Sequence, residues 1–212
     1  SQEKKFRELY NKFKGTPMEV SSESAEHKKL RYSELIKIVD SESNFTIHDV
    51  GMGVGNFCDY LKTNKNTFTY SGSEILKEYV EECRRKFPNQ LFYHRDLSEN
   101  PGNEKYDYLV LSGVFHQRGI ITIPNWEIYL KNILKNSFSM SKKGIAVNFI
   151  SPFVDFYQEN IYYADFFKLI NFIRDDLSRF FTINHSYALF EFTVFIYREN
   201  YIKNKYSEKE FK

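Results

Sequence analysis

Cysteine is scarce in this chain, which has only Cys58 and Cys83 among its 212 residues. Both lie in segments predicted to be helical, and their spacing matches no metal-ligand pattern. A disulfide framework and a cysteine-based zinc site are therefore excluded. We expect two reduced thiols in a cytoplasmic protein.

An excess of charge of one sign is also missing. The 30 basic and 28 acidic residues are interspersed and leave a net charge of +2. The sequence has no stripe of basic residues, so it does not suggest a nucleic-acid partner. No apolar run reaches the length of a membrane-spanning helix, and the charged N-terminal segment lacks the apolar centre of a signal peptide. Repeats, low-complexity tracts and dividing linkers are absent as well.

The chain has enough apolar residues for a substantial core. Hydrophobic residues make up 42% of it, with 21 phenylalanines and 16 tyrosines. At this length we expect one domain with a small cap.

Three glycines at alternate positions form the most informative stretch, TIHDVGMGVGNFCDYL from Thr46 to Leu61. A short apolar run ends at Gly51, Gly53 and Gly55, and an amphipathic segment follows. The pattern predicts a strand, a tight glycine loop and a helix start, as in the first unit of a nucleotide-binding α/β sheet.

The residues around this loop argue against a dinucleotide. The third glycine of the G-x-G-x-x-G pattern would fall on Asn56, and Asp49 stands just before the loop. A carboxylate there would repel a pyrophosphate, whereas it would attract the ammonium and sulfonium groups of S-adenosylmethionine (SAM).

Asp49-Val50-Gly51-Met52-Gly53-Val54-Gly55 resembles the first motif of the class I SAM-dependent methyltransferases, an acid followed by G-x-G-x-G. The alternative is a glycine-rich turn in another α/β protein. The resemblance implies SAM as cofactor and a loop that cradles it.

Two later acids fit the same resemblance. Glu74 follows the second predicted strand, 19 residues after Gly55, where an acid would bind the ribose hydroxyls. Asp96 follows the third strand and would bind the adenine amino group, with the backbone of Leu97 beside it. The alternatives are a solvent-facing Glu74 and a metal site at His94 and Asp96, which lacks further ligands.

The fourth predicted strand, YDYLVLS, is apolar throughout, as a buried parallel strand should be. Ser112, Gly113 and Val114 follow it and should pass beneath the cofactor. His116 should then point toward the transferred methyl group. On an N-terminal helix, Arg31 would reach the SAM carboxylate, or it would be an ordinary surface residue.

The order of predicted segments implies a seven-stranded, mostly parallel Rossmann-like sheet. It ends in an antiparallel hairpin and carries helices on both faces. We expect an N-terminal helical cap (1–44), a SAM-binding core (45–198) and a frayed polar C-terminal tail (199–212). The individual segments are helices at 23–39, 55–63, 77–87, 126–140 and 166–180, and strands at 46–50, 67–73, 90–94, 106–112, 144–150, 182–187 and 190–198.

His116 is the first candidate for a general base, because imidazole titrates near neutral pH; the alternative is a structural histidine. Tyr163, on an aromatic loop over 151–165, is a second catalytic candidate, or part of ordinary lid packing. Arg95 and Arg118 would balance a phosphate-bearing acceptor or be solvated. Carboxylates do not cluster near the fourth and fifth strands, so we predict no metal.

Several segments also resemble small methyltransferases encoded with bacterial surface-polysaccharide genes, including one kind that methylates capsule phosphoramidate. These segments are LSGVFHQ, KKGIAVNF, YYAD and FEFTV. This implies an O-methyltransferase of capsule biosynthesis acting on a nucleotide sugar, sugar phosphate or phosphoramidate. The alternative is a non-catalytic SAM-fold binding or regulatory protein. A NAD-type oxidoreductase is disfavoured by Asn56 and Asp49.

Overall fold

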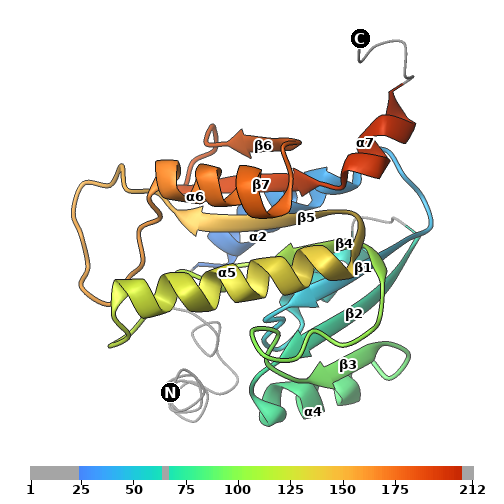
Figure 1. The fold of residues 1–212 in the computed structure, drawn as a ribbon. Helices are drawn as coiled ribbons and strands as arrows, with labels where there is room; N and C mark the ends of the chain where they lie inside the picture. Colours follow the sequence, from blue (N-terminus) through green and yellow to red (C-terminus); the bar gives the residue numbers. More distant parts are fainter. Residues whose placement is uncertain (1–23, 64–66, 207–212) are drawn as a thin grey trace.

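The computed structural model describes residues 24–63 and 67–206, which form a single seven-stranded sheet in the order β3-β2-β1-β4-β5-β7-β6. Five strands run parallel, and β7 lies antiparallel to both β5 and β6. The predicted sheet with its terminal hairpin is confirmed (Figure 1). The strands are β1 (Phe45–Val50), β2 (Phe68–Glu74), β3 (Leu91–His94), β4 (Tyr106–Leu111), β5 (Ser141–Ile150), β6 (Phe181–Asn184) and β7 (Glu191–Tyr197).

Helices cover both faces of the sheet (Figure 1). On one face lie α5 and α6 with the π-helix η3, and on the other lie α2, the 3-10 helix η2, α3 and α4. The bounds are α2 (Ala25–Leu35), η2 (Ile36–Val39), α3 (Asn56–Thr63), α4 (Lys77–Lys86), α5 (Ile123–Met140), α6 (Phe166–Phe172), η3 (Ile173–Leu177) and α7 (Glu199–Lys205).

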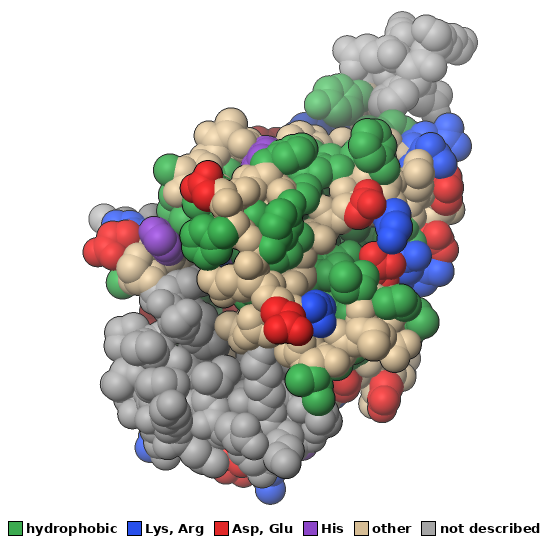
Figure 2. All heavy atoms as spheres, turned by 90° about the vertical axis from the view of Figure 1, so that its left-hand side faces the viewer, with side chains coloured by type: hydrophobic (Ala, Val, Ile, Leu, Met, Phe, Trp, Pro, Cys, Tyr) green, Lys and Arg blue, Asp and Glu red, His purple; other side chains and the backbone are tan. Residues whose placement is uncertain are grey.

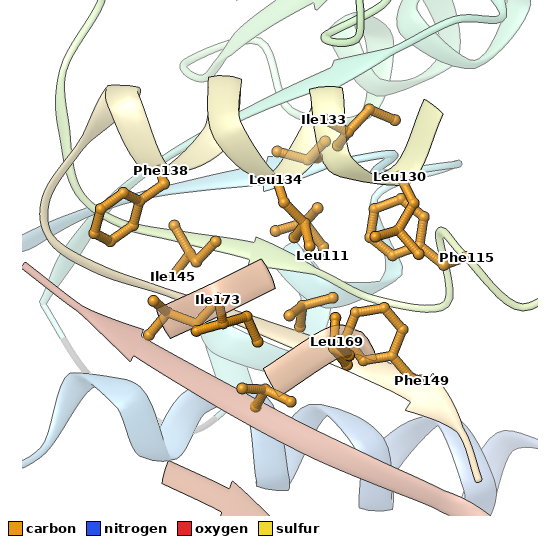
Figure 3. Packing of buried hydrophobic residues seen from close by; sticks show 14 of the residues in the cluster. Leu111, Phe115, Leu130, Ile133, Leu134, Phe138, Ile145, Phe149, Leu169 and Ile173 are labelled. Carbon is orange, nitrogen blue, oxygen red and sulfur yellow. The ribbon is translucent and has the colours of Figure 1, made fainter. Parts of the chain in front are cut away.

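The larger core lies between α5, α6 and the sheet. Leu130 and Leu134 of α5 are one helical turn apart and point toward the sheet (Figure 3), and Ile133 is buried in the same cluster. Leu169 and Ile173 close the cluster from α6 and η3. Because these side chains are almost fully buried, they fix α5 against the carboxyl halves of the central strands.

The helix α2 belongs to the core rather than to a separate lid. Ser24 begins it as N-cap, accepting a hydrogen bond from the His27 backbone N–H at 3.2 Å. Leu35 and the following Ile38 and Val39 are buried against the second face of the sheet. The part of the expected N-terminal cap that precedes residue 24 lies outside the described residues.

The start of β5 differs from the prediction, which left residues 141–143 between a helix ending at 140 and a strand beginning at Gly144. The helix ends at Met140 and the strand begins directly at Ser141, so Lys142 and Lys143 are strand residues. Gly144 is needed for packing instead, because a Cβ there would lie 2.6 Å from the Ile196 carbonyl oxygen of β7.

Two further segments differ from their predicted structure. The helix predicted over 166–180 continues past Phe172 as a π-helix, in which the Ser178 N–H bonds to the Ile173 carbonyl at 2.8 Å. Residues 199–205 were expected to be frayed but form α7, where Tyr201 packs edge-on against Tyr108 of β4. The periodicity of apolar residues predicts neither the π-helix nor α7. Across the described ranges, no helix is long and apolar enough to cross a membrane.

Candidate functional site

The glycine loop between β1 and α3 has the geometry that its sequence predicts. Gly51, Gly53 and Gly55 all have positive φ angles, of 70°, 55° and 79°. A Cβ on Gly51 would lie 2.9 Å from Val114 Cγ2, and one on Gly55 would lie 2.5 Å from Phe87 Cε2. Both the backbone angles and the close packing therefore require glycine here.

Asp49 is the penultimate residue of β1, just before this loop, and is almost completely buried. The Tyr70 hydroxyl donates to Oδ2 at 2.7 Å, whereas Oδ1 has no hydrogen-bond partner among the described residues. Burial raises the pKa of Asp49 to about 7, opposed by the Tyr70 hydrogen bond and assisted by nearby Glu74. A buried carboxylate oxygen without a partner is costly unless a ligand supplies a cation or donor.

Glu74 joins the end of β2 to the glycine loop. Its Oε2 accepts the Gly53 N–H at 3.0 Å, and Oε1 accepts the N–H groups of Ile75 and Leu76 at 2.7 and 3.2 Å. Burial raises the pKa of Glu74, and these backbone donors oppose the rise. The carboxylate is thus fixed beside the loop.

Asp96 and Leu97 follow β3 at the same edge of the sheet. Asp96 Oδ1 accepts the Ser98 N–H at 2.8 Å, and the Leu97 carbonyl accepts from Asn136 of α5 at 2.6 Å. Tyr129 of α5 lies near: burial, and then the charge of Asp96, raise the pKa of its hydroxyl.

These residues share one pocket at the carboxyl ends of β1, β2 and β4, where ligands bind in open α/β sheets. It is walled by α2 on one side and α5 on the other. Its lining includes nearly all of the predicted cofactor residues: Arg31, Asp49, Gly51, Glu74, Asp96, Leu97, Ser112, Gly113 and Val114, together with His116.

Arg31 and His116 are connected through two residues that the sequence analysis did not single out, Asn148 and Glu191. Arg31 pairs with Glu191, with Nε 2.9 Å from Oε2. Asn148 Nδ2 contacts the same carboxylate and lies 3.1 Å from His116 Nε2. The sequence signal for them was an asparagine inside the apolar strand GIAVNFI and a glutamate at the start of the strand EFTVFIY.

We compared the chain with known proteins by sequence and by structure. No protein-family model matches the sequence. The putative methyltransferase Rv1506c of Mycobacterium tuberculosis H37Rv is 26% identical over 163 residues, which span 76% of this chain and 98% of the relative.

Two solved structures superpose over most of the chain. The N-methyltransferase NodS of Bradyrhizobium japonicum WM9, in complex with S-adenosylhomocysteine (SAH), has a TM-score of 0.64 at 10% identity, covering 92% of this chain and 98% of NodS. The magnesium protoporphyrin IX methyltransferase of Synechocystis PCC 6803, with bound SAM, has a TM-score of 0.57 at 15% identity and covers 82% and 80%. The fold is that of the class I SAM-dependent methyltransferases.

In this methyltransferase fold, Tyr163 lies outside the pocket. Its hydroxyl accepts the Gln158 N–H at 2.8 Å, and its ring packs edge-on against Tyr157 within the loop that follows β5. A catalytic role for Tyr163 stays a prediction. The same loop, orange in Figure 1, carries Phe153, Phe156 and Tyr157 exposed to solvent, and Figure 2 shows hydrophobic side chains gathered on that side.

The two other arginines have local partners. Arg118 donates to the Gly119, Ile121 and Glu159 carbonyls and so ties two loops together. Arg95 pairs with Glu104 at 3.0 Å. Within the part of the methyltransferase fold that the structure describes, no three histidine, cysteine or acidic side chains lie close enough to hold a metal ion.

Proposed function

We propose that this protein is a SAM-dependent methyltransferase that transfers a methyl group to an oxygen of a small acceptor in bacterial surface-polysaccharide biosynthesis. The observation that carries the proposal is Asp49, a buried acid with one oxygen left without a partner beneath a cradle of positive-φ glycines. A ligand with a cationic group and no pyrophosphate satisfies that oxygen.

The remaining residues suit the other parts of SAM. Glu74 is a fixed acceptor for ribose hydroxyls. We propose that Asp96 and the backbone of Leu97 bind the adenine edge and that Arg31 binds the SAM carboxylate, since all three line the pocket. When bound, SAM supplies a methyl group already activated on sulfur. The chain's own residues bind and orient the two reactants and exclude water.

The acceptor is proposed to enter at the His116 side of the pocket, bordered by the aromatic loop over 151–165. An oxygen acceptor, either a sugar hydroxyl or a phosphate or phosphoramidate group, is supported by the resemblance of LSGVFHQ and KKGIAVNF to surface-polysaccharide methyltransferases. The chemistry named for NodS and for the protoporphyrin enzyme belongs to those proteins.

Calorimetric titration with SAH tests the proposal, with NAD as control ligand. We expect SAH alone to bind. Glu74→Ala should weaken SAH binding about 10-fold or more, because hydrogen bonds to a buried charged group are lost. Asp49→Ala should also weaken it, because the ammonium group loses its counter-charge.

Glu81→Ala is the matched control, since Glu81 is exposed on α4 and pairs only loosely with Lys77, at 3.6 Å. Unchanged SAH affinity in both site variants would remove the assigned cofactor site. Tight SAH binding without transfer to any acceptor would favour the non-catalytic alternative.

A further inference from the structure

Four buried polar side chains form a chain of contacts from α2 to the loop after β4. Arg31 donates through Nε and Nη2 to the two oxygens of Glu191. Asn148 donates from Nδ2 to Glu191 Oε2, and the same Nδ2 lies 3.1 Å from His116 Nε2. Their exposed fractions are 4% for Arg31 and Glu191, 0% for Asn148 and 6% for His116. Because these four polar side chains are buried, their hydrogen-bonding groups need well-defined partners.

Two neighbours fix the orientation of the Asn148 amide. The Gly113 backbone N–H, which can only donate, lies 2.8 Å from Oδ1. The Glu191 carboxylate, held by Arg31, accepts on the other side. Rotating the amide by half a turn would set donor against donor and acceptor against acceptor, and both hydrogen bonds would be lost. Asn148 therefore presents an N–H to His116.

The consequence for His116 follows from imidazole chemistry. A ring nitrogen that accepts an N–H carries no proton, so a neutral His116 holds its proton on Nδ1. Nδ1 lies on the Gly113 side, 3.8 Å from the position that a Cβ on Gly113 would occupy. Gly113 and His116 both line the pocket.

We propose that Asn148 and Glu191 are positioning residues that hold His116 as a neutral Nδ1–H imidazole, and that His116 donates a hydrogen bond to the methyl acceptor instead of removing its proton. The inference rests on the proposed function and narrows it. The acceptor atom is then an oxyanion, a phosphate-type or carboxylate oxygen, and not a sugar hydroxyl.

The other groups around the pocket support this choice. Its acidic lining residues in the described chain are Asp49, Glu74 and Asp96. All three end or follow β1, β2 or β3, whereas His116 is tied to β5, on the far side of β4. Among the described lining residues, none of these three carboxylates lies on the His116 side of β4 to take the proton of an alcohol. Transfer to an oxyanion forms one C–O bond, breaks one S–C bond, leaves the electron pair on sulfur and releases no proton.

The tautomer of His116 can be observed directly. In protein labelled with ¹⁵N-histidine, and with His116→Gln used to assign the signal, long-range ¹H–¹⁵N spectra at neutral pH should show a neutral ring with its proton on Nδ1. Asn148→Asp keeps an acceptor for the Gly113 N–H but removes the donor to His116. We expect this variant to move the His116 proton to Nε2 or to add a second proton.

Asn184→Asp is the matched control. Asn184 donates to Glu34 at 2.7 Å, the same kind of bond at a place that does not line the pocket. The His116 signal should be unchanged in this variant. A wild-type ring protonated on Nε2, or one that Asn148→Asp leaves unaltered, would overturn the proposal.

Methyl transfer tests the acceptor class. The probes are a sugar phosphate, a phosphoramidate monoester, a uronic acid and a neutral methyl glycoside, each with SAM. We expect product from an oxyanion probe and none from the glycoside, and the panel separates phosphorus-bound from carboxylate oxygens. Asn148→Asp should lower kcat about 10- to 100-fold while SAH affinity stays unchanged.

The two proposals fail in different ways. Transfer to the hydroxyl of the neutral glycoside, with SAH bound normally, would refute the oxyanion inference and leave the methyltransferase intact. Absence of SAH binding would refute the proposed function itself. An Asn148→Asp variant with wild-type kcat on an oxyanion acceptor would remove Asn148 from the positioning role.

Discussion

At the scale of single residues, Asp49 combines a large electrostatic cost with a preference for a cationic ligand. Its buried carboxyl has a pKa of about 7, chiefly because burial disfavours the charge. An unfolded chain would hold the same group at its ordinary pKa of about 3.9. Between these values the folded protein keeps a proton that the unfolded chain has released.

The free energy of unfolding should therefore fall as the pH rises from about 4 to about 7, and Asp49 should add no further slope above that. The difference of about three pKa units corresponds to about 4 kcal/mol. Asp49→Asn should remove this slope, as measured by urea unfolding of both proteins over that range. Parallel pH profiles of the two proteins would show that Asp49 ionises normally.

The comparison with the variant is needed because His48 acts in the opposite direction. Burial, with a contribution from Arg95, lowers the pKa of His48 to about 3. Over about pH 3 to 6.5 the unfolded chain binds a proton that the folded chain does not, so this residue makes the protein more stable as the pH rises. His48 is the same in both proteins, and its effect cancels in the difference.

The sequence predicts some site residues and misses others for a physical reason. Asp49, Glu74 and Asp96 each end or closely follow a strand, so counting along the chain is enough to bring them to one edge. Asn148 and Glu191 acquire their role only through partners more than 30 residues away, at separations of 32 and 160. No local pattern carries that information.

At the scale of elements, the β5–β7 pairing depends on Gly144. The nearest atoms to an added Cβ belong to the backbone of Ile196 and Tyr197, at 2.6 and 3.3 Å. Backbone cannot swing aside as a long side chain can. Gly144→Ala should therefore lower the free energy of unfolding by about 1–3 kcal/mol through local overpacking.

Lys142→Ala is the control for this substitution, because Lys142 is exposed on the same strand. It should change stability by less than about 0.5 kcal/mol. Thermal and urea unfolding measure both variants. Equal stability of Gly144→Ala and wild type would mean that the two strands separate easily at this point.

The mostly parallel sheet with its terminal hairpin and most of its helices were predictable because apolar periodicity and short connections limit the possible sheets. The start of β5 at Ser141, the π-helix η3 and α7 were not. Tertiary contacts bear on two of these, Gly144 against β7 and Tyr201 against Tyr108. The periodicity of apolar residues indicates which face of a segment can be buried. It does not indicate where contacts with a neighbouring element begin or end that segment.

At the scale of the whole molecule, the pocket is lined by residues from Lys28 to Ile133 and is supported by residues as far along the chain as Glu191. A ligand that binds only this assembled form stabilises the entire fold. SAH at 100 times its Kd should add about 2.7 kcal/mol and raise Tm by about 5–10 °C. Differential scanning fluorimetry measures the shift, and an equal shift with NAD would contradict SAM-type specificity.

The pairing of Arg31 with Glu191, 160 residues apart, also has a consequence for how the protein is made. A ribosome delivers α2 and the glycine loop long before β7, and closing so large a loop carries a substantial entropic cost. The strand that holds Arg31 in place, β7, enters the sheet between β5 and β6 and is synthesised after both of the strands that it separates and after α2. A nascent chain that ends before β7 therefore carries the glycine loop with neither Arg31 nor His116 set in place, and the complete site is among the last features to form.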